Sequence, residues 1–475
     1  MATSSKPSLL KSSFWYVVSG FLSKSVVLFM MPIYVRLLSK GQYGDYSNFT
    51  SWLSVFSSTA LMNLQFLIIR DTGDDSQKND QLFWNVFYAI LLVSLPLVIP
   101  MALAPQFVGR LLLLTPGQVY LLVLYLTLVP LFQLATARMR AQLSVRSFVI
   151  ANLSVTFAAA SLSMVLMVFF PTHRLEAFIL GQTAPFIAAS LLLAAPRLSA
   201  LIAPRWEALK PILSIGLPMI PHILGITIIN RINRVMVYNM LGAEAAGDFA
   251  LVANLLLILT TLSTALVQAY TPWLTRRLRE EQLSLIGLVS GAQIGVFLYF
   301  IAGLAVLAPE LLLFWGGRAY ANALPLLPPL LASALFTHMQ TLLVNVEFFY
   351  ESKRTLVYST FLAAAVNILL NLWVLPRWGT IGASYTSLVS TLLLYALHDR
   401  AVRSLGKTQV IAPLAAYGGS ILILLLTVLL PFIYRHSTLR YSLVCLGLIA
   451  TLLATFVAFH YRLKIAQALS RLTKP

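Results

Sequence analysis

Apolar runs of about 20 residues, the length that an α-helix needs to cross a hydrocarbon core about 30 Å thick, follow one another along the whole chain. Charged residues make up only 10% of the 475 positions, whereas an ordinary soluble domain has about 25%. A soluble enzyme is therefore excluded, and a secreted disulfide scaffold is excluded because Cys445 is the only cysteine. We predict an all-α polytopic membrane protein with about 14 transmembrane helices. The runs lie at about 14–38, 46–69, 82–103, 118–136, 147–170, 175–195, 212–241, 249–274, 284–307, 321–349, 355–375, 381–398, 410–434 and 441–461.

The distribution of basic residues predicts how these spans are oriented. If the N-terminus is cytoplasmic, the loops on that side hold 22 of the 33 lysines and arginines, the opposite loops hold eight, and three lie inside spans. Basic residues concentrate in cytoplasmic loops, so we predict that both the N- and the C-terminus are cytoplasmic. Topology then accounts for most of the net charge of +18, and no nucleic acid is expected as a partner.

Short sequence matches at a nearly constant offset indicate an internal repeat. Gly44-Asp45-Tyr46 recurs as Gly247-Asp248-Phe249, 203 residues later, and the Ser-Thr-Ala-Leu of 58–61 recurs at 263–266. The repeat unit contains six spans, an even number, so the two halves have the same orientation in the membrane. We predict two pseudo-symmetric six-helix lobes plus two C-terminal helices. The expected boundaries are 1–195 for the N-lobe, 196–211 for a cytoplasmic linker, 212–400 for the C-lobe, and 401–475 for the appended spans 13 and 14 and a cytoplasmic tail.

Three cations lie inside predicted spans. Lys24 and Arg231 are each about ten residues, or about 15 Å, from the end of their span. Intramembrane charges are costly and usually mark a ligand or ion pathway, and arginine presents a planar fork that fits phosphate oxygens. We predict that these cations line a cavity; the alternative is that each pairs with a carboxylate or with helix-end carbonyls and only sets packing. The candidate substrate-binding residues are Lys24, Thr227, Asn230, Arg231, Arg234 and Tyr238.

Four further residues are candidates for a coupling or gate role. Glu347 and His338 lie in the same predicted span and could couple transport to protons, because histidine titrates near neutral pH. We favour the alternative that Glu347 pairs with Lys353 or Arg354 and that His338 is hydrogen-bonded. Asp45 and Asp248 are repeat-related and are interpreted as helix N-caps, with a gate role as the alternative.

No residue pattern predicts covalent chemistry. The chain has no HExxH motif, no cluster of histidine and cysteine, and no pair of carboxylates in a plausible pocket. We therefore expect a transporter rather than an enzyme, with no metal site and no cofactor.

With these residues in view, the chain resembles the polysaccharide and oligosaccharide flippases, which include O-antigen and exopolysaccharide translocases, of the multidrug, oligosaccharidyl-lipid and polysaccharide exporter superfamily. Where many members have Asp-Arg in the seventh span, this chain has Asn233-Arg234. The change removes a possible internal counter-ion and leaves Arg234 more available to an anionic ligand. The motifs that carry the resemblance are Ser19-Gly20 through Pro32, Arg36-Leu37-Leu38, Tyr43-Gly44-Asp45-Tyr46, Gly216-Leu217-Pro218 through Asn233-Arg234, and Asn367 and Asn371 with Pro376, Gly379, Gly382 and Ala383.

The resemblance implies a flippase of the bacterial inner membrane. Such a protein moves an undecaprenyl-pyrophosphate-linked oligosaccharide, for example a lipopolysaccharide O-antigen unit, from the cytoplasmic to the periplasmic leaflet by alternating access. Its expected partners are this lipid-linked substrate, membrane lipids, and the polysaccharide polymerase and chain-length machinery. One rival is a multidrug cation exporter of the same fold, which predicts buried carboxylates in the N-lobe cavity. The other is a membrane-embedded glycosyltransferase or ligase, which predicts a large polar loop.

Overall fold

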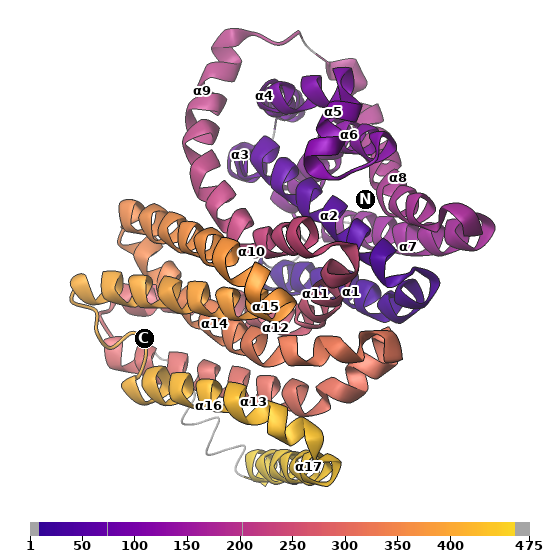
Figure 1. Cartoon of the computed structure of the whole chain (residues 1–475). Helices are drawn as coiled ribbons and strands as arrows, with labels where there is room; N and C mark the ends of the chain where they lie inside the picture. The colour runs from indigo at the N-terminus through magenta and orange to yellow at the C-terminus, as the bar shows by residue number, and fades with distance from the viewer. Residues whose placement is uncertain (1–8, 74, 202, 461–475) are drawn as a thin grey trace. The chain divides into compact units, whose positions relative to one another are not determined.

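The computed structural model describes residues 9–73, 75–201 and 203–460, and within these residues the chain is helical and contains no strand (Figure 1). Ten helices of the described chain are long and apolar enough to cross a membrane, or up to twelve if each of two bent helix pairs is one span. The prediction of an all-α multi-pass membrane protein is confirmed. The predicted count of fourteen is compatible with this range, because α15 (Lys353–Ser404) is 52 residues long and breaks at Gly379.

The chain divides into two compact units. Unit 1 consists of Met1–Asn254 and Thr360–Ala383, and unit 2 consists of Leu255–Ser359 and Ser384–Pro475. The predicted lobes follow the sequence repeat rather than contacts, so their boundaries stay a prediction. The helices of unit 1 are α1 (Leu9–Leu37), α2 (Lys40–Leu61), α3 (Gln65–Asp71), α4 (Ser76–Leu103), α5 (Pro105–Leu112), α6 (Pro116–Ala141), α7 (Val145–Phe169), α8 (Arg174–Ala194), α9 (Trp206–Gly216), α10 (Ile220–Leu241) and α11 (Ala243–Leu255), together with part of α15.

A capping box sets the start of α2. The Ser39 hydroxyl accepts a hydrogen bond from the backbone N–H of Gln42 at 3.2 Å, and the Ser39 N–H donates to the Gln42 side chain at 2.9 Å. These two bonds satisfy N–H groups that the first helical turn leaves without partners. The helix therefore starts at Lys40, and the prediction that Asp45 is its N-cap is wrong. Asp248 is likewise inside α11, which starts at Ala243, so its predicted capping role is wrong for the same reason.

Three breaks in the helices have local causes. Met62 and Asn63 have φ of 46° and 56°, and α2 and α3 meet there at 41°. A short 3₁₀ segment, Leu217–Met219, joins α9 to α10, and the two parts of this span bend by 47°. Gly379 in α15 has φ 60° and ψ −149°, a conformation that glycine adopts without steric cost.

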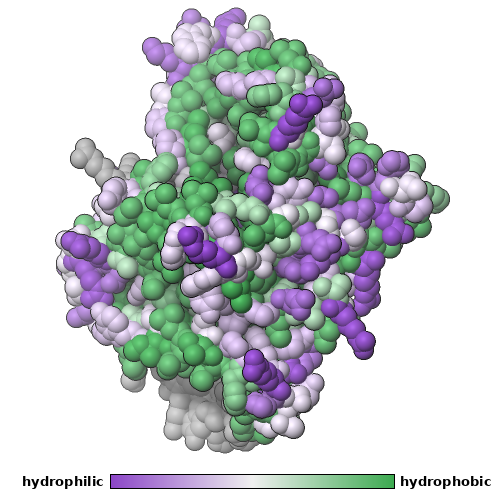
Figure 2. All heavy atoms as spheres, in the orientation of Figure 1, coloured by the Kyte–Doolittle hydropathy of each residue, from purple (hydrophilic) through white to green (hydrophobic). Residues whose placement is uncertain are grey.

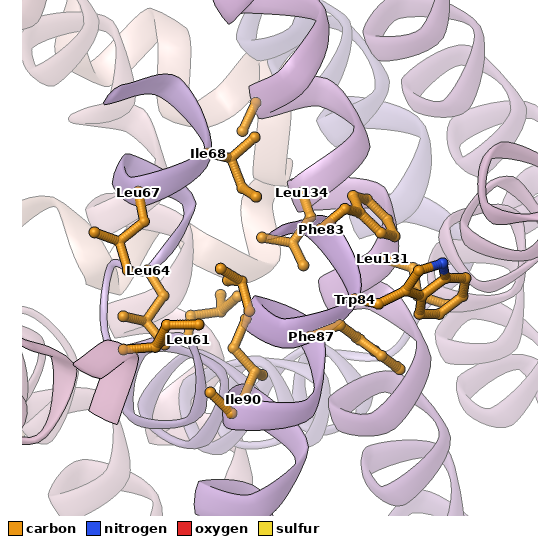
Figure 3. Packing of buried hydrophobic residues seen from close by; sticks show 14 of the residues in the cluster. Leu61, Leu64, Leu67, Ile68, Phe83, Trp84, Phe87, Ile90, Leu131 and Leu134 are labelled. Atoms are coloured by element: carbon orange, nitrogen blue, oxygen red, sulfur yellow. The ribbon is translucent and has the colours of Figure 1, made fainter. Parts of the chain in front are cut away.

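A hydrophobic cluster of unit 1 joins α3, α4 and α6 (Figure 3). Phe83, Ile90 and Leu134 are fully buried in it. At its edge the Trp84 indole N–H donates to the carbonyl of Arg197 at 3.0 Å. Because lipid chains are as apolar as these side chains, close packing rather than escape from water holds such a cluster together.

Unit 2 is built on α13, which packs against α12, α14, α16 and α17. The face seen in Figure 2 has broad apolar areas, with hydrophilic side chains in groups between them. Large apolar side chains such as Phe29 and Leu103, 79% and 81% exposed, would be costly in water, so we interpret this surface as lipid-facing. The helices of unit 2 are α12 (Leu257–Arg279), α13 (Leu283–Gly316), α14 (Leu327–Phe349), the remainder of α15, α16 (Gly419–Arg435) and α17 (Ser437–His460).

Candidate functional site

The candidate substrate-binding residues of the seventh predicted span lie on α10, which packs beside α2 (Figure 1). Residues at spacings of three and four share one face of a helix, so Thr227, Arg231, Arg234 and Tyr238 form one line along α10. Thr227 lies 3.1 Å from the Ser58 hydroxyl of α2, which fixes one end of this line. Asn230, the remaining predicted residue, is on the same helix and is exposed.

Two hydrogen-bonded connections join α10 to α2. The Arg234 guanidinium donates to the Asn254 side-chain oxygen at 3.1 Å, and the Asn254 amide donates to the Tyr43 hydroxyl at 2.7 Å. The Tyr238 hydroxyl donates to the Asp45 carboxylate at 2.6 Å. The sequence did not identify Tyr43 or Asn254 as site residues, although Tyr43 lies within a resemblance motif.

The carboxylates near this line are engaged by groups other than Arg231 and Arg234. Asp45 accepts from Tyr238, and Asp248 of α11 forms an ion pair with Lys40 at 2.7 Å. Within the described part of the chain, no carboxylate lies within 4.0 Å of either arginine. The two half-buried guanidinium groups, which we call the basic face of α10, therefore have no carboxylate partner among the described residues.

Lys24 is half-buried on α1, and no hydrogen bond or ion pair links it to the basic face within the described residues. Its neighbours Ser19 and Ser23 both accept from the Asn152 amide of α7, at 3.2 and 2.9 Å. Two of the polar side chains of α1, Ser19 and Ser23, therefore face α7. The predicted role of Lys24 beside Arg231 and Arg234 stays a prediction.

The starts of α2 and α11 meet in a reciprocal contact. A Cβ atom added at Gly44 would lie 1.9 Å from the Ala243 carbonyl oxygen, and one added at Gly247 would lie 2.3 Å from the Lys40 carbonyl oxygen. Lys40 and Ala243 are separated by the same 203 residues as Gly44 and Gly247, so each half of the repeat makes the contact that the other half makes. We call these four residues the α2–α11 contact.

Two segments that are distant in the sequence, α10 and α15, are joined by hydrogen bonds between asparagines. The Asn371 amide of α15 donates to the Asn233 side-chain oxygen at 2.5 Å and to the Asn367 side-chain oxygen at 3.1 Å. All three asparagines are at most 6% exposed. Asn233, a neutral amide beside Arg234 in sequence, is therefore hydrogen-bonded to α15.

In unit 2, the structure gives Glu347 a partner that the sequence did not reveal. The His398 ring nitrogen Nδ1 lies 2.5 Å from a Glu347 carboxylate oxygen. The side chains of Lys353 and Arg354, the partners expected from sequence, lie outside the described residues. His338 bonds to the Ser263 hydroxyl at 2.8 Å and stacks on Phe297, so the prediction that it is hydrogen-bonded is confirmed.

Comparison with known families identifies the family of the chain. Residues 9–277, more than half of the chain, match the family described as "Polysaccharide biosynthesis protein". The chain belongs to this polysaccharide biosynthesis protein family. None of the curated proteins matches it.

Solved structures confirm the fold. The chain resembles "Lipid II flippase MurJ, inward closed conformation" with a TM-score of 0.70 at 12% identity, over 94% of this chain and 99% of that one. An inward-facing multidrug resistance MATE family transporter of the MOP superfamily matches with a TM-score of 0.56 at 14% identity, over 81% of this chain and 96% of that one. The MATE multidrug transporter DinF-BH matches with a TM-score of 0.55 at 18% identity, over 85% of this chain and 97% of that one. The family member described here therefore has the fold of flippases and multidrug transporters.

Proposed function

We propose that this chain is a flippase that moves an undecaprenyl-pyrophosphate-linked oligosaccharide from the cytoplasmic to the periplasmic leaflet by alternating access. Membrane lipids, and the polymerase and chain-length machinery that receive the glycan, are its proposed partners. The proposal includes an inner-membrane location, cytoplasmic termini and no covalent chemistry. The basic face of α10 is the observation that carries it.

A pyrophosphate needs neutralising charge and several hydrogen-bond donors when it leaves water. Arg231 and Arg234 are spaced by three residues, so both guanidinium groups point to the same side of α10. Each presents a fork of N–H donors that matches phosphate oxygens, and charge-assisted bonds of this kind are about twice as strong as neutral ones. Because the described acids at this site are already engaged, the arginines are available to an anionic headgroup.

The α2–α11 contact supports the alternating-access part of the proposal. It joins the first helical turns of α2 and α11 through backbone atoms and the Lys40–Asp248 ion pair. A contact confined to helix ends can separate without disturbing the packed middles of the helices. We assign it as the closure on the periplasmic side of the substrate.

Deletion of the gene tests the proposed substrate and direction. We expect an undecaprenyl-pyrophosphate-linked glycan to accumulate on the cytoplasmic leaflet, because the chain that moves it is absent. Lipid extraction with mass spectrometry identifies the glycan, and its access to an impermeant lectin added to intact spheroplasts identifies the leaflet. Complementation with the wild-type gene should clear the accumulated glycan.

A multidrug cation exporter is the second candidate, since two of the similar structures are MATE transporters. It predicts that the deletion raises sensitivity to lipophilic cations and leaves lipid-linked glycans unchanged. That result would overturn the flippase proposal. The engaged state of Asp45 and Asp248 favours the flippase, because a cation exporter needs a carboxylate that is free for its substrate.

The proposed orientation predicts a labelling pattern. In a Cys445→Ser background, a cysteine at Lys78 should resist an impermeant maleimide in intact cells, whereas one at Glu244 should react. Both positions are exposed, so the side of the membrane rather than burial decides the result. Permeabilised cells, in which both should react, provide the control, and the opposite pattern in intact cells would invert the topology.

A further inference from the structure

The Glu347–His398 pair is the most deeply buried pair of titratable groups among the described ion pairs. Glu347 is 0% exposed and His398 is 1% exposed, and their nearest atoms are 2.5 Å apart. The second carboxylate oxygen of Glu347 is also buried and has no hydrogen-bond partner in the described structure. Burying an acceptor without a partner is costly, so a group kept in this state calls for an explanation.

Buried positions beside each partner on its own helix are apolar. Leu343, one turn before Glu347 on α14, is 1% exposed, and Val346 is 0% exposed. On α15, Leu394 and Val402 lie one turn to either side of His398 and are also buried. No charged group among these neighbours can offset a net charge on the pair.

The other described charged side chains of unit 2 on the elements around α14 have partners elsewhere or face outward. Buried Arg277 pairs with Glu280 and buried Arg440 with Glu310, while Asp399, next to His398, pairs with Arg403. The remaining groups are His338 bonded to Ser263, Lys407 paired with Glu281, the exposed Arg276, Arg279, Arg318, Arg400 and Arg435, and the phenols Tyr270, Tyr299, Tyr320, Tyr358, Tyr385, Tyr395, Tyr417 and Tyr434.

The number of protons on the pair therefore decides its net charge. With one proton the pair is neutral, either as carboxylate and imidazolium or as carboxyl and imidazole. With two protons it carries one positive charge, and with none it carries one negative charge. Because an uncompensated charge is costly in an apolar interior, only the one-proton state fits the closed, dry packing.

We propose that Glu347 and His398 form a proton-binding site whose loading and unloading open unit 2 to water. The unpartnered oxygen of Glu347 is where an additional proton binds. Gain of that proton gives the pair a charge that must be hydrated, so the packing around it loosens, and loss of the proton restores the dry state. A proton gradient across the membrane would then favour one direction of the conformational change over the reverse.

Water access beside the pair tests this proposal without any glycan. A reporter cysteine replaces Val346, which is buried and close to cysteine in size, in a Cys445→Ser background. The rate of its reaction with a small methanethiosulfonate reagent is measured on purified protein in nanodiscs between pH 5 and pH 7. The same reporter in a Glu347→Gln/His398→Gln protein provides the reference, because the ratio of the two rates cancels the pH dependence of the thiol itself.

We expect this ratio to rise at least tenfold between pH 7 and pH 5. A rise below threefold would overturn the proposal. Glu310→Gln, which removes one charge from the partly exposed pair with Arg440, is the matched control and should keep the full pH response; loss of the response there would also overturn the assignment. If the double variant is not recovered as monodisperse protein, Glu347→Gln alone serves as the reference, since it removes the oxygen at which the additional proton binds.

Discussion

Gly44→Ala and Gly247→Ala should each lower glycan transport at least tenfold while the protein remains in the membrane at normal abundance. The added methyl group would lie 1.9 Å from the Ala243 oxygen in the first variant and 2.3 Å from the Lys40 oxygen in the second. Both obstacles are backbone atoms, which cannot move aside as a flexible side chain can. Alanine is also a better helix former than glycine by about 1 kcal/mol, so the helices themselves are not weakened. The variants therefore destabilise the α2–α11 contact selectively.

Gly41→Ala is the matched control for this prediction. Gly41 lies on the same helical turn of α2, but a Cβ atom there would meet its nearest neighbour at 3.8 Å, an ordinary van der Waals distance. Its transport should be close to wild type. A cysteine at Ala246, which is 1% exposed, should react with thiol reagents faster in the Gly44→Ala protein than in the Gly41→Ala protein. Equal reactivity and normal transport would show that this contact is not a closure that transport requires.

Arg231→Gln and Arg234→Gln should each weaken substrate engagement by about ten- to a hundredfold. Each substitution removes charge-assisted hydrogen bonds worth roughly 1.5–3 kcal/mol, and 1.4 kcal/mol corresponds to one factor of ten. The arginine-to-lysine variants should retain part of the activity, because charge is kept and only the forked geometry is lost. Transport of the lipid-linked glycan into the outer leaflet is measured together with protein abundance in the same cells.

Two comparisons separate binding from packing at the basic face. Arg110→Gln, at an exposed position in the last turn of α5, removes the same charge elsewhere and should transport normally. Loss of Arg234 also removes its bond to Asn254, so Asn254→Ala reports what that bond alone contributes. If the glutamine variants are abundant and transport at the wild-type rate, the proposed pyrophosphate site is wrong. If they are inactive only because they are missing from the membrane, packing explains the cations.

The sequence predicted the helical framework because each signal for it is local. Apolar runs marked the spans. The start of α2 was misplaced although its signal was present: Ser39 and Gln42 have the spacing of a capping box. The candidate residues of α10 could also be grouped from a local signal, since residues three and four apart on one helix share a face.

Contacts between distant helices could not be predicted in this way. His398 lies 51 residues after Glu347, and the two meet only because α14 and α15 pack in one particular register. The same holds for Asn233 and Asn371, 138 residues apart, and for Tyr43 and Asn254. A single sequence gives the face on which each side chain lies, but the rotation of one helix against another depends on packing along the whole interface.

The α2–α11 contact also bears on how such a chain could have arisen. In a two-fold dimer of the first repeat alone, Lys40 of each copy would face Asp45 of the other, because Asp45 is equivalent to Asp248. That ancestor-like arrangement would carry two ion pairs, whereas a dimer of the second repeat would carry none, since Ala243 replaces the lysine. In this chain the described contact holds the Lys40–Asp248 ion pair, and Asp45 binds Tyr238 instead. The two halves of the contact are therefore chemically unequal, although the glycines make the same close approach in both.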